Sequence, residues 1–181
     1  MFSIGILVTT LDEGARVSNS LEAKIAKLEA ALAELQDERA IRTLISRYAI
    51  HTDAGRVSEW LNLWTDDGVE EIDFQGRLLR WAGKQEMTAW RQGAAEQRRD
   101  QPNNRMHFQS ANVVVHLSGN EATASSYAFA LGLDGGKAVV TSYGAVRWAL
   151  RKRDGRWLIK ARMVREMNSA ELRQALAATP Q

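Results

Sequence analysis

Apolar residues follow a seven-residue repeat in the stretch LEAKIAKLEAALAELQ, which begins at Leu21. They recur at alternating spacings of four and three, at Leu21, Ile25, Leu28, Leu32 and Leu35. This is the pattern of a helix whose narrow apolar seam contacts another helix. One amphipathic helix packing on its own domain is the alternative. We favour pairing with another chain and predict a helical arm over residues 20–36.

A second set of apolar positions continues the helical period after the arm, offset from the seam: Ile41, Leu44, Ile45 and Tyr48. The offset indicates that this part of the helix packs against something different from the arm. Gly55 is expected to end the helix, as glycine does just past a helix C-terminus. The stretch VSEWLNLWTDDG then predicts a short helix, followed by a turn at Asp66, Asp67 and Gly68.

The rest of the chain alternates in the manner of β-strands. VEEIDF and LLRWAG flank Gly76 and predict a hairpin, and KQEMTAWRQGAAEQRR predicts a helix after it. Four longer strands follow, MHFQSANVVVHL, EATASSYAFALGL, KAVVTSYGAVRWALRKR and RWLIKARMVREM, separated by short glycine-containing turns. Such turns favour an antiparallel meander. A short polar helix, NSAELRQALAA, is predicted near the end of the sequence.

Helices followed by one long sheet indicate an α+β domain. We expect a curved antiparallel sheet whose helices gather on one face and cover a pocket. The predicted organisation is a flexible leader over 1–19, the helical arm over 20–36, the domain over 37–168 and a C-terminal helix or tail over 169–181. The leader, MFSIGILVTT, has no basic region before its apolar residues, so we do not expect a signal peptide.

Composition narrows the class of protein. Lysine and arginine total 24 against 22 acidic residues, a net charge of +2, and no basic run is interleaved with aromatic residues. Nucleic acid is therefore not an expected partner. The absence of cysteine excludes disulfides and thiolate chemistry and is compatible with a cytoplasmic location, which we expect. No apolar stretch reaches the ~18 residues of a membrane span.

The three histidines do not have the spacing of a metal site. His51 has no second ligand four residues away, and His107 and His116 have opposite parity on one predicted strand. We therefore predict no metal. His51 and His116 are interpreted as structural or exposed, whereas His107 opens a strand after a polar loop.

Asp53 is unexpected at its position. A carboxylate near a helix C-terminus is disfavoured by the helix dipole, so Asp53 does not serve helix stability. Local conflicts of this kind tend to mark functional sites. If the pocket brings Asp53 to His107, the carboxylate would orient the imidazole and raise its basicity. His107 could then remove a proton from carbon, with Tyr48 as a hydrogen-bond donor or proton carrier at the pocket mouth.

Three stretches resemble the SnoaL-like branch of the nuclear transport factor 2-like superfamily. They are DERAIRTLISRYAIHTDAGRVSEWLNLWTDDGV, RMHF and SYGAVRWALRKRDGRWLIKARMV, and together they cover roughly residues 37–166. The resemblance implies a cone-shaped α+β barrel with a deep apolar pocket. Scytalone dehydratase, bile-acid dehydratase and hexachlorocyclohexane dehydrochlorinase belong to this branch.

The resemblance also implies a chemistry. Lyases of this group use an Asp–His pair without a cofactor, which Asp53 and His107 match, and Tyr48 matches a tyrosine of the dehydratases. The dehydratases carry a further polar acid or histidine about one strand later, where this chain reads SSYAFALG. That departure moves the leaving-group acid to Tyr127 or Tyr48.

We therefore expect a cofactor-independent lyase acting on a small, hydrophobic, ring-containing substrate. Catalysis is assigned to His107, Asp53 and Tyr48, and substrate contact is assigned to four aromatic residues: Trp64, Phe74, Trp81 and Tyr127. An isomerase or an aldol-type cyclase would use the same proton abstraction, and a non-catalytic ligand-binding or assembly module is the alternative of another class. Apolar residues on the outer sheet face favour a homodimer or a higher homo-oligomer.

Overall fold

A computed structural model describes residues 5–74, 76–97 and 105–166, with side chains described from Ser20 onward except at Phe74 and at 95–97. The predicted C-terminal helix lies outside the described residues. The chain forms two compact units, Met1–Asp37 and Glu38–Gln181. Helix α1 (Gly5–Asp53) contributes to both, so the helix predicted from about Ser20 begins earlier, at Gly5.

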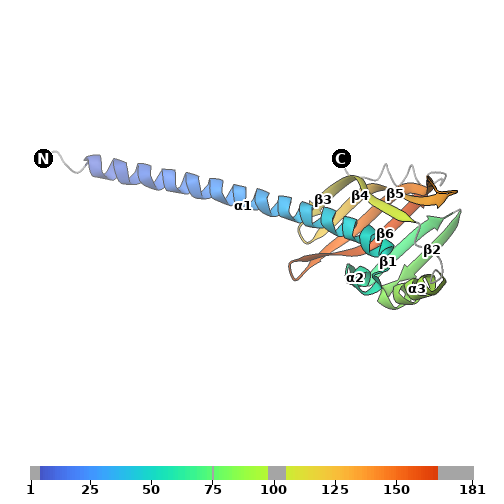
Figure 1. Cartoon of the computed structure of the whole chain (residues 1–181). Coiled ribbons are helices and arrows are strands. Elements are labelled where there is room, and N and C mark those ends of the chain that lie inside the picture. The colour runs from blue at the N-terminus through green and yellow to red at the C-terminus, as the bar shows by residue number, and fades with distance from the viewer. Residues whose placement is uncertain (1–4, 75, 98–104, 167–181) are drawn as a thin grey trace. The chain divides into compact units, whose positions relative to one another are not determined.

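In the second unit the described residues form six strands and, besides the end of α1, two helices (Figure 1). The helices are α2 (Val57–Leu61) and α3 (Gly83–Gln97). The strands are β1 (Trp64–Phe74), β2 (Arg77–Ala82), β3 (Met106–Ser118), β4 (Glu121–Asp134), β5 (Lys137–Arg153) and β6 (Arg156–Glu166). They form one sheet in the order β2-β1-β6-β5-β4-β3. The α+β class and the meander from β3 to β6 are thereby confirmed.

One strand pairing differs from the prediction. β1 and β6 run parallel, with Val69 opposite Ala161 and Ile72 opposite Val164, so the sheet is mixed rather than wholly antiparallel. The reason is topological, because β6 returns beside β1 after α3 and the meander have intervened. Local alternation along a strand carries no information on the direction of a distant neighbour.

The turn predicted at Asp66, Asp67 and Gly68 is also wrong, because these residues lie within β1. The register of β1 against β6 shifts between Trp64 and Val69, which is an irregularity of the kind that a β-bulge produces. A Cβ atom on Gly68 would lie 2.9 Å from the Trp64 ring, so only glycine allows this close approach. The turn-like residues therefore bend a strand instead of ending one.

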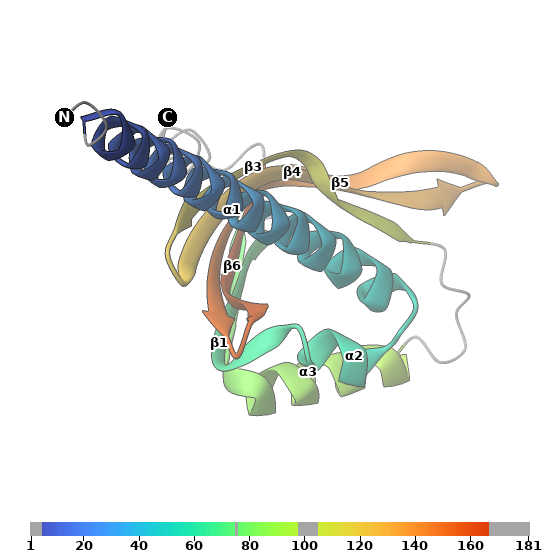
Figure 2. The same ribbon diagram turned by 90° about the vertical axis from the view of Figure 1, so that its left-hand side faces the viewer.

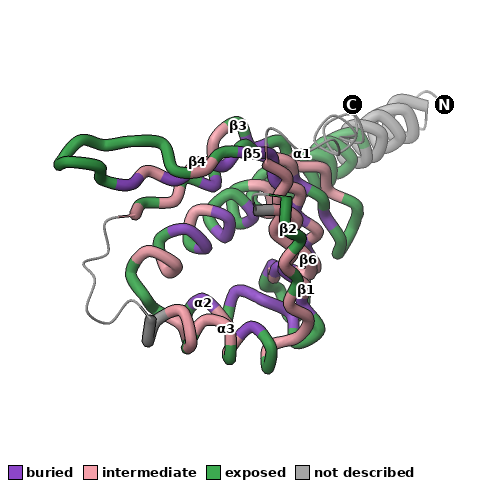
Figure 3. The backbone as a smooth tube through the Cα atoms, turned by 90° about the vertical axis from the view of Figure 1, so that its right-hand side faces the viewer, coloured by how far each residue is buried: buried purple, intermediate pink, exposed green. Residues whose placement is uncertain are grey.

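The core lies between the concave side of the sheet and the helices. Figure 2 shows the sheet curving around the last turns of α1, with α2 and α3 closing the arch, and Figure 3 shows buried positions on these facing elements. The largest fully buried side chains include Trp60, Trp64, Trp148, Ile41 and Ile45. The offset apolar set of α1 thus packs inside its own domain, as its period indicated.

Candidate active site

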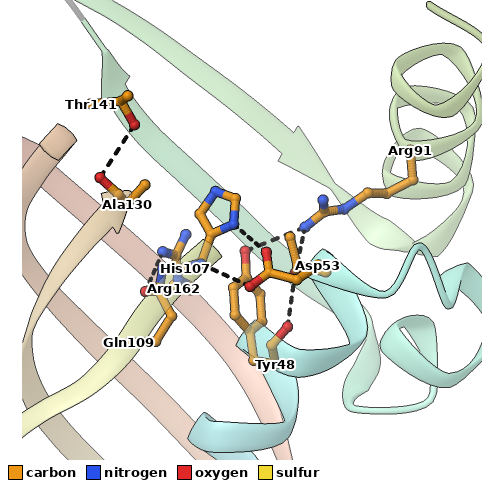
Figure 4. A network of polar contacts seen from close by, with 9 residues as sticks. Tyr48, Asp53, Arg91, His107, Gln109, Ala130, Thr141 and Arg162 are labelled. Atoms are coloured by element: carbon orange, nitrogen blue, oxygen red, sulfur yellow. Dashed lines mark hydrogen bonds and ion pairs between the residues drawn. The ribbon is translucent and has the colours of Figure 1, made fainter. Parts of the chain in front are cut away.

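Asp53 and His107 meet at the end of α1. The Asp53 Oδ1 atom lies 2.5 Å from His107 Nδ1, and Asp53 Oδ2 accepts a hydrogen bond of 2.7 Å from the His107 backbone N–H (Figure 4). Asp53 is the last residue of α1 and His107 the second residue of β3, so the carboxylate joins two elements 54 residues apart. The predicted pairing of these two residues is what the structure shows.

This geometry selects one tautomer of the imidazole. A carboxylate accepts hydrogen bonds, so Nδ1 carries the proton that faces Asp53, and Nε2 keeps its lone pair. The second bond, to the backbone of His107, prevents the carboxylate from turning away from the ring. The pair is therefore oriented for His107 Nε2 to accept a proton.

The protonation of His107 follows from its surroundings. Burial lowers the pKa of His107 below its ordinary value of 6.5, and Arg162 and Arg105 lower it further, while the bond to Asp53 raises it. The net direction is downward, so the ring is neutral at pH 7 and can act as a base. Without Asp53, burial would lower the pKa of His107 further.

We predict a matching pH dependence for any reaction in which His107 is the base. The rate should fall as the pH drops through the lowered pKa of His107, so the midpoint of the acidic limb should lie below pH 6.5. The free energy of unfolding should also fall at low pH. The contribution of His107 to it is fully present above pH 6.5, the pKa of an ordinary histidine, and is lost as the pH falls through the folded-state pKa. A pH–rate profile and an NMR titration of His107 measure both. An acidic limb centred above pH 6.5 would contradict this assignment.

A cavity of about 250 Å³ lies beside His107. Its lining combines polar groups, among them His107, Gln109 and Arg162, with the aromatic rings of Trp81, Trp90, Phe129 and Tyr143. Apolar cavities of about 150 Å³ accept benzene, so this one has room for a compound of one or two rings. The lining also includes the charged residues Asp73, Arg105 and Glu166. Cavities that combine apolar and aromatic walls with polar groups are typical of small-molecule sites.

The four residues expected to contact substrate have different positions. Trp81 lines the cavity, stacked on Trp90 with ring centroids 4.0 Å apart. Trp64 is fully buried in the hydrophobic core and is not among the cavity-lining residues. Tyr127 is 47% exposed. The side chain of Phe74 lies outside the described residues.

Tyr48 is tied to a buried ion pair. Its hydroxyl donates a hydrogen bond of 2.6 Å to Glu70 Oε1, the same oxygen that Arg162 Nη1 contacts at 2.6 Å. Burial raises the pKa of Tyr48 above its ordinary value of 10. The hydroxyl is therefore a neutral donor, and its proton is directed to Glu70.

Sequence reasoning missed Glu70, Gln109 and Arg91 as members of this network. Arg162 Nη2 donates to Gln109 Oε1 at 2.7 Å, and both side chains are buried. The Arg91 guanidinium lies over the rings of Trp60 and Trp90, 4.2 and 4.3 Å from their centroids, and donates to the Tyr48 hydroxyl at 3.5 Å. Glu70 had a detectable signal, because it shares strand parity with apolar Ile72 although it is charged. Gln109 had a different signal, because it has the same strand parity as His107 and so points to the same side of β3.

No metal site is evident in the described part of the chain, where no group of three or more histidine and acidic side chains could hold an ion. None of the described helices is both long and apolar enough to cross a membrane.

Comparison with known proteins identifies the family. The sequence profile of the SnoaL-like domain matches residues 33–163, most of the chain. The chain belongs to the SnoaL-like family. No curated protein matches this SnoaL-like chain at a significant level.

Solved structures agree with the family. A nuclear transport factor 2-like protein with a cystatin-like fold from Novosphingobium aromaticivorans is 26% identical, with a TM-score of 0.72, and the match covers 82% of this chain and 94% of that one. A proposed scytalone dehydratase from the same organism is 21% identical, with a TM-score of 0.60 over 74% and 86% of the two chains. The β subunit of benzoate 1,2-dioxygenase from Burkholderia mallei is 17% identical, with a TM-score of 0.61 over 71% and 89%. The last two similarities concern the fold alone.

Proposed function

We propose that this SnoaL-like protein is a cofactor-independent lyase that eliminates water or a related group from a small hydrophobic ring compound. The observation that carries the proposal is the Asp53–His107 pair beside an aromatic-walled cavity. The lowered pKa of His107 keeps the ring neutral, as a general base requires. The similarity in fold to a proposed scytalone dehydratase is consistent with this class.

In the proposed step one residue, His107, both removes the proton and returns it. His107 Nε2 takes a proton from a ring carbon beside a carbonyl, and the electron pair forms the new double bond as the bond to the neighbouring leaving oxygen breaks. The imidazolium then returns its proton to the leaving oxygen, so water departs and His107 is neutral again. Asp53 stabilises the imidazolium while it exists, as the carboxylate of a catalytic triad does.

Gln109 is the proposed donor to the substrate carbonyl. Arg162 can only donate, so the oxygen of the Gln109 amide must face it, at the observed 2.7 Å. The amide nitrogen is then directed elsewhere, and Gln109 lines the cavity two residues from His107 on β3. A fixed donor beside the base would stabilise the negative charge that develops on the carbonyl oxygen. Tyr48 remains in the proposed set as a positioning residue, acting through Glu70 and Arg162.

Gln109→Glu tests this role selectively. An ionised glutamate still accepts the hydrogen bond from Arg162 but offers no donor to the cavity, so kcat/KM should fall by about 10²–10³-fold. The melting temperature should fall too, because a second carboxylate is then buried beside the one arginine that already pairs with Glu70. Steady-state kinetics and thermal unfolding measure the two effects. Gln109→Met is the comparison variant, because it removes the acceptor as well and should lower the melting temperature. Unchanged kcat/KM in Gln109→Glu would exclude the assigned role.

Two alternative functions are each supported by part of the same observations. An isomerase or aldol-type cyclase would begin with the same proton abstraction. A non-catalytic binding or assembly module is favoured by one observation, the similarity in fold to a dioxygenase β subunit. A panel of cyclic β-hydroxy ketones and aromatic alcohols separates these classes: elimination products indicate a lyase, rearranged products an isomerase or cyclase, and binding without turnover a module.

We also propose a cytoplasmic homodimer or higher homo-oligomer. The absence of cysteine is compatible with a reducing compartment. Exposed apolar residues on the sheet that do not line the cavity, among them Val114, Tyr127 and Val140, are those that a second copy would cover.

A further inference from the structure

The first compact unit carries a row of exposed aliphatic side chains that the proposed reaction does not use. Five of them fall on one seam of α1 and are between 46% and 70% exposed: Leu21, Ile25, Leu28, Leu32 and Leu35. Isolated exposed leucines are ordinary, but five in uninterrupted heptad register are not. From this seam we infer that α1 pairs with α1 of a second copy of the chain as a parallel, in-register, two-stranded coiled coil.

The seam has a defined end. Continuing the heptad beyond Leu35 would place Arg39 and Arg42 in the seam, where charged residues do not belong. The helix changes its apolar face at this point, because Ile41, Ile45 and Tyr48 are buried in their own domain. One continuous helix thus serves two purposes, and its domain-packed end anchors the exposed part. That anchoring offsets the nucleation cost that makes short isolated helices marginal.

The residues in the seam favour a coiled coil of two helices over larger bundles. If Leu21, Leu28 and Leu35 occupy d positions, Ile25 and Leu32 occupy a positions. Of the two a residues, Ile25 is β-branched, and a β-branched residue at a with leucine at d favours parallel dimers over larger bundles.

The flanking charges favour the parallel orientation. Lys24 then occupies a g position, and Glu29 the e position of the next heptad. In a parallel dimer, g of one chain meets the following e of its partner, so Lys24 faces the partner's Glu29 and the contact is attractive. An antiparallel pair would instead place e beside e, bringing the acidic residues Glu22 and Glu29 of the two chains together.

The chain has no cysteine, so single introduced cysteines report the geometry directly. In a parallel in-register dimer each seam position faces itself, so Leu21→Cys and Leu35→Cys should each give a disulfide-linked dimer under mild oxidation. Ala30→Cys, at the outward f position of the same helix, is the matched control and should cross-link at least tenfold more slowly. The full-length chain is used throughout, with unfolding followed to show that each variant is folded.

The outcomes are distinct. An antiparallel pair places a positions against the d positions of the partner, so it would cross-link Leu21→Cys to Leu32→Cys in a mixture but neither variant with itself, which would overturn the parallel geometry. Cross-linking of the seam variants no faster than Ala30→Cys would overturn the pairing altogether, even if the protein dimerises through another surface. Sedimentation supplies a second readout: Lys24→Glu should weaken association several-fold, and Lys24→Glu/Glu29→Lys should restore it. Neither measurement depends on the proposed reaction.

Discussion

Replacing His107 by glutamine is expected to lower kcat/KM by about 10²–10⁴-fold, the usual contribution of a positioned general base. Glutamine can still donate a hydrogen bond to Asp53, so the junction between α1 and β3 is retained. What disappears is the ring nitrogen that accepts the proton. Steady-state kinetics on any substrate found in the panel, with circular dichroism as a check of folding, measure the effect.

His116→Gln is the matched control for this prediction. His116 lies on the same strand, β3, but is not among the residues that line the cavity. Its replacement should leave kcat/KM within about twofold of the wild type. Equal losses of kcat/KM in the two variants would mean that replacing a histidine disturbs the strand rather than removing the base. A His107→Gln variant with wild-type kcat/KM would show that His107 is not the base.

The second large effect concerns stability. Arg162→Met should lower the free energy of unfolding by about 3–5 kcal/mol, because it leaves the Glu70 carboxylate buried without its partner. The side chains of Arg162 and Glu70 are 4% and 0% exposed, and their charged atoms lie 2.6 Å apart. Gln109 would lose its donor as well. Urea unfolding of the variant measures the loss.

The sheet offers a matched exposed pair. Arg151 contacts Glu121 at the same distance, 2.6 Å, but their side chains are 27% and 50% exposed. Arg151→Met should therefore cost only about 0–1 kcal/mol. Glu70→Gln/Arg162→Met should recover part of the loss, because no uncompensated charge remains. Similar losses in the free energy of unfolding for Arg162→Met and Arg151→Met would show that burial does not determine how much the Glu70–Arg162 pair contributes to stability.

The pairing of Asp53 with His107 could be anticipated because both residues gave local signals. Asp53 opposes the dipole of its own helix, and His107 opens a strand after a polar loop. The resemblance to the SnoaL-like branch supplied the link between them. Residue spacing alone could not, since the two are 54 positions apart.

Other features depended on contacts that the sequence does not display. The Asp66–Gly68 stretch has the composition of a turn, yet the approach of Trp64 to Gly68 holds it inside β1. The parallel pairing of β1 with β6 is set by the path of the whole chain. Glu70 stands among other acidic residues in the stretch VEEIDF, and its contacts with Tyr48 and Arg162 show why a charge is buried there.

The proposed function requires that Asp53 hold His107 in the tautomer that accepts a proton from carbon. Asp53→Asn tests it most directly, because the amide can keep the bond to the His107 backbone while presenting N–H to Nδ1, which leaves the proton on Nε2. The measurement is the NMR-detected exchange of carbon-bound protons of cyclic ketones into deuterated water. We expect exchange by the wild type above the buffer rate and at least a hundredfold loss in a folded Asp53→Asn variant. Equal exchange by the two proteins, or ligand binding with no exchange by either, would contradict it.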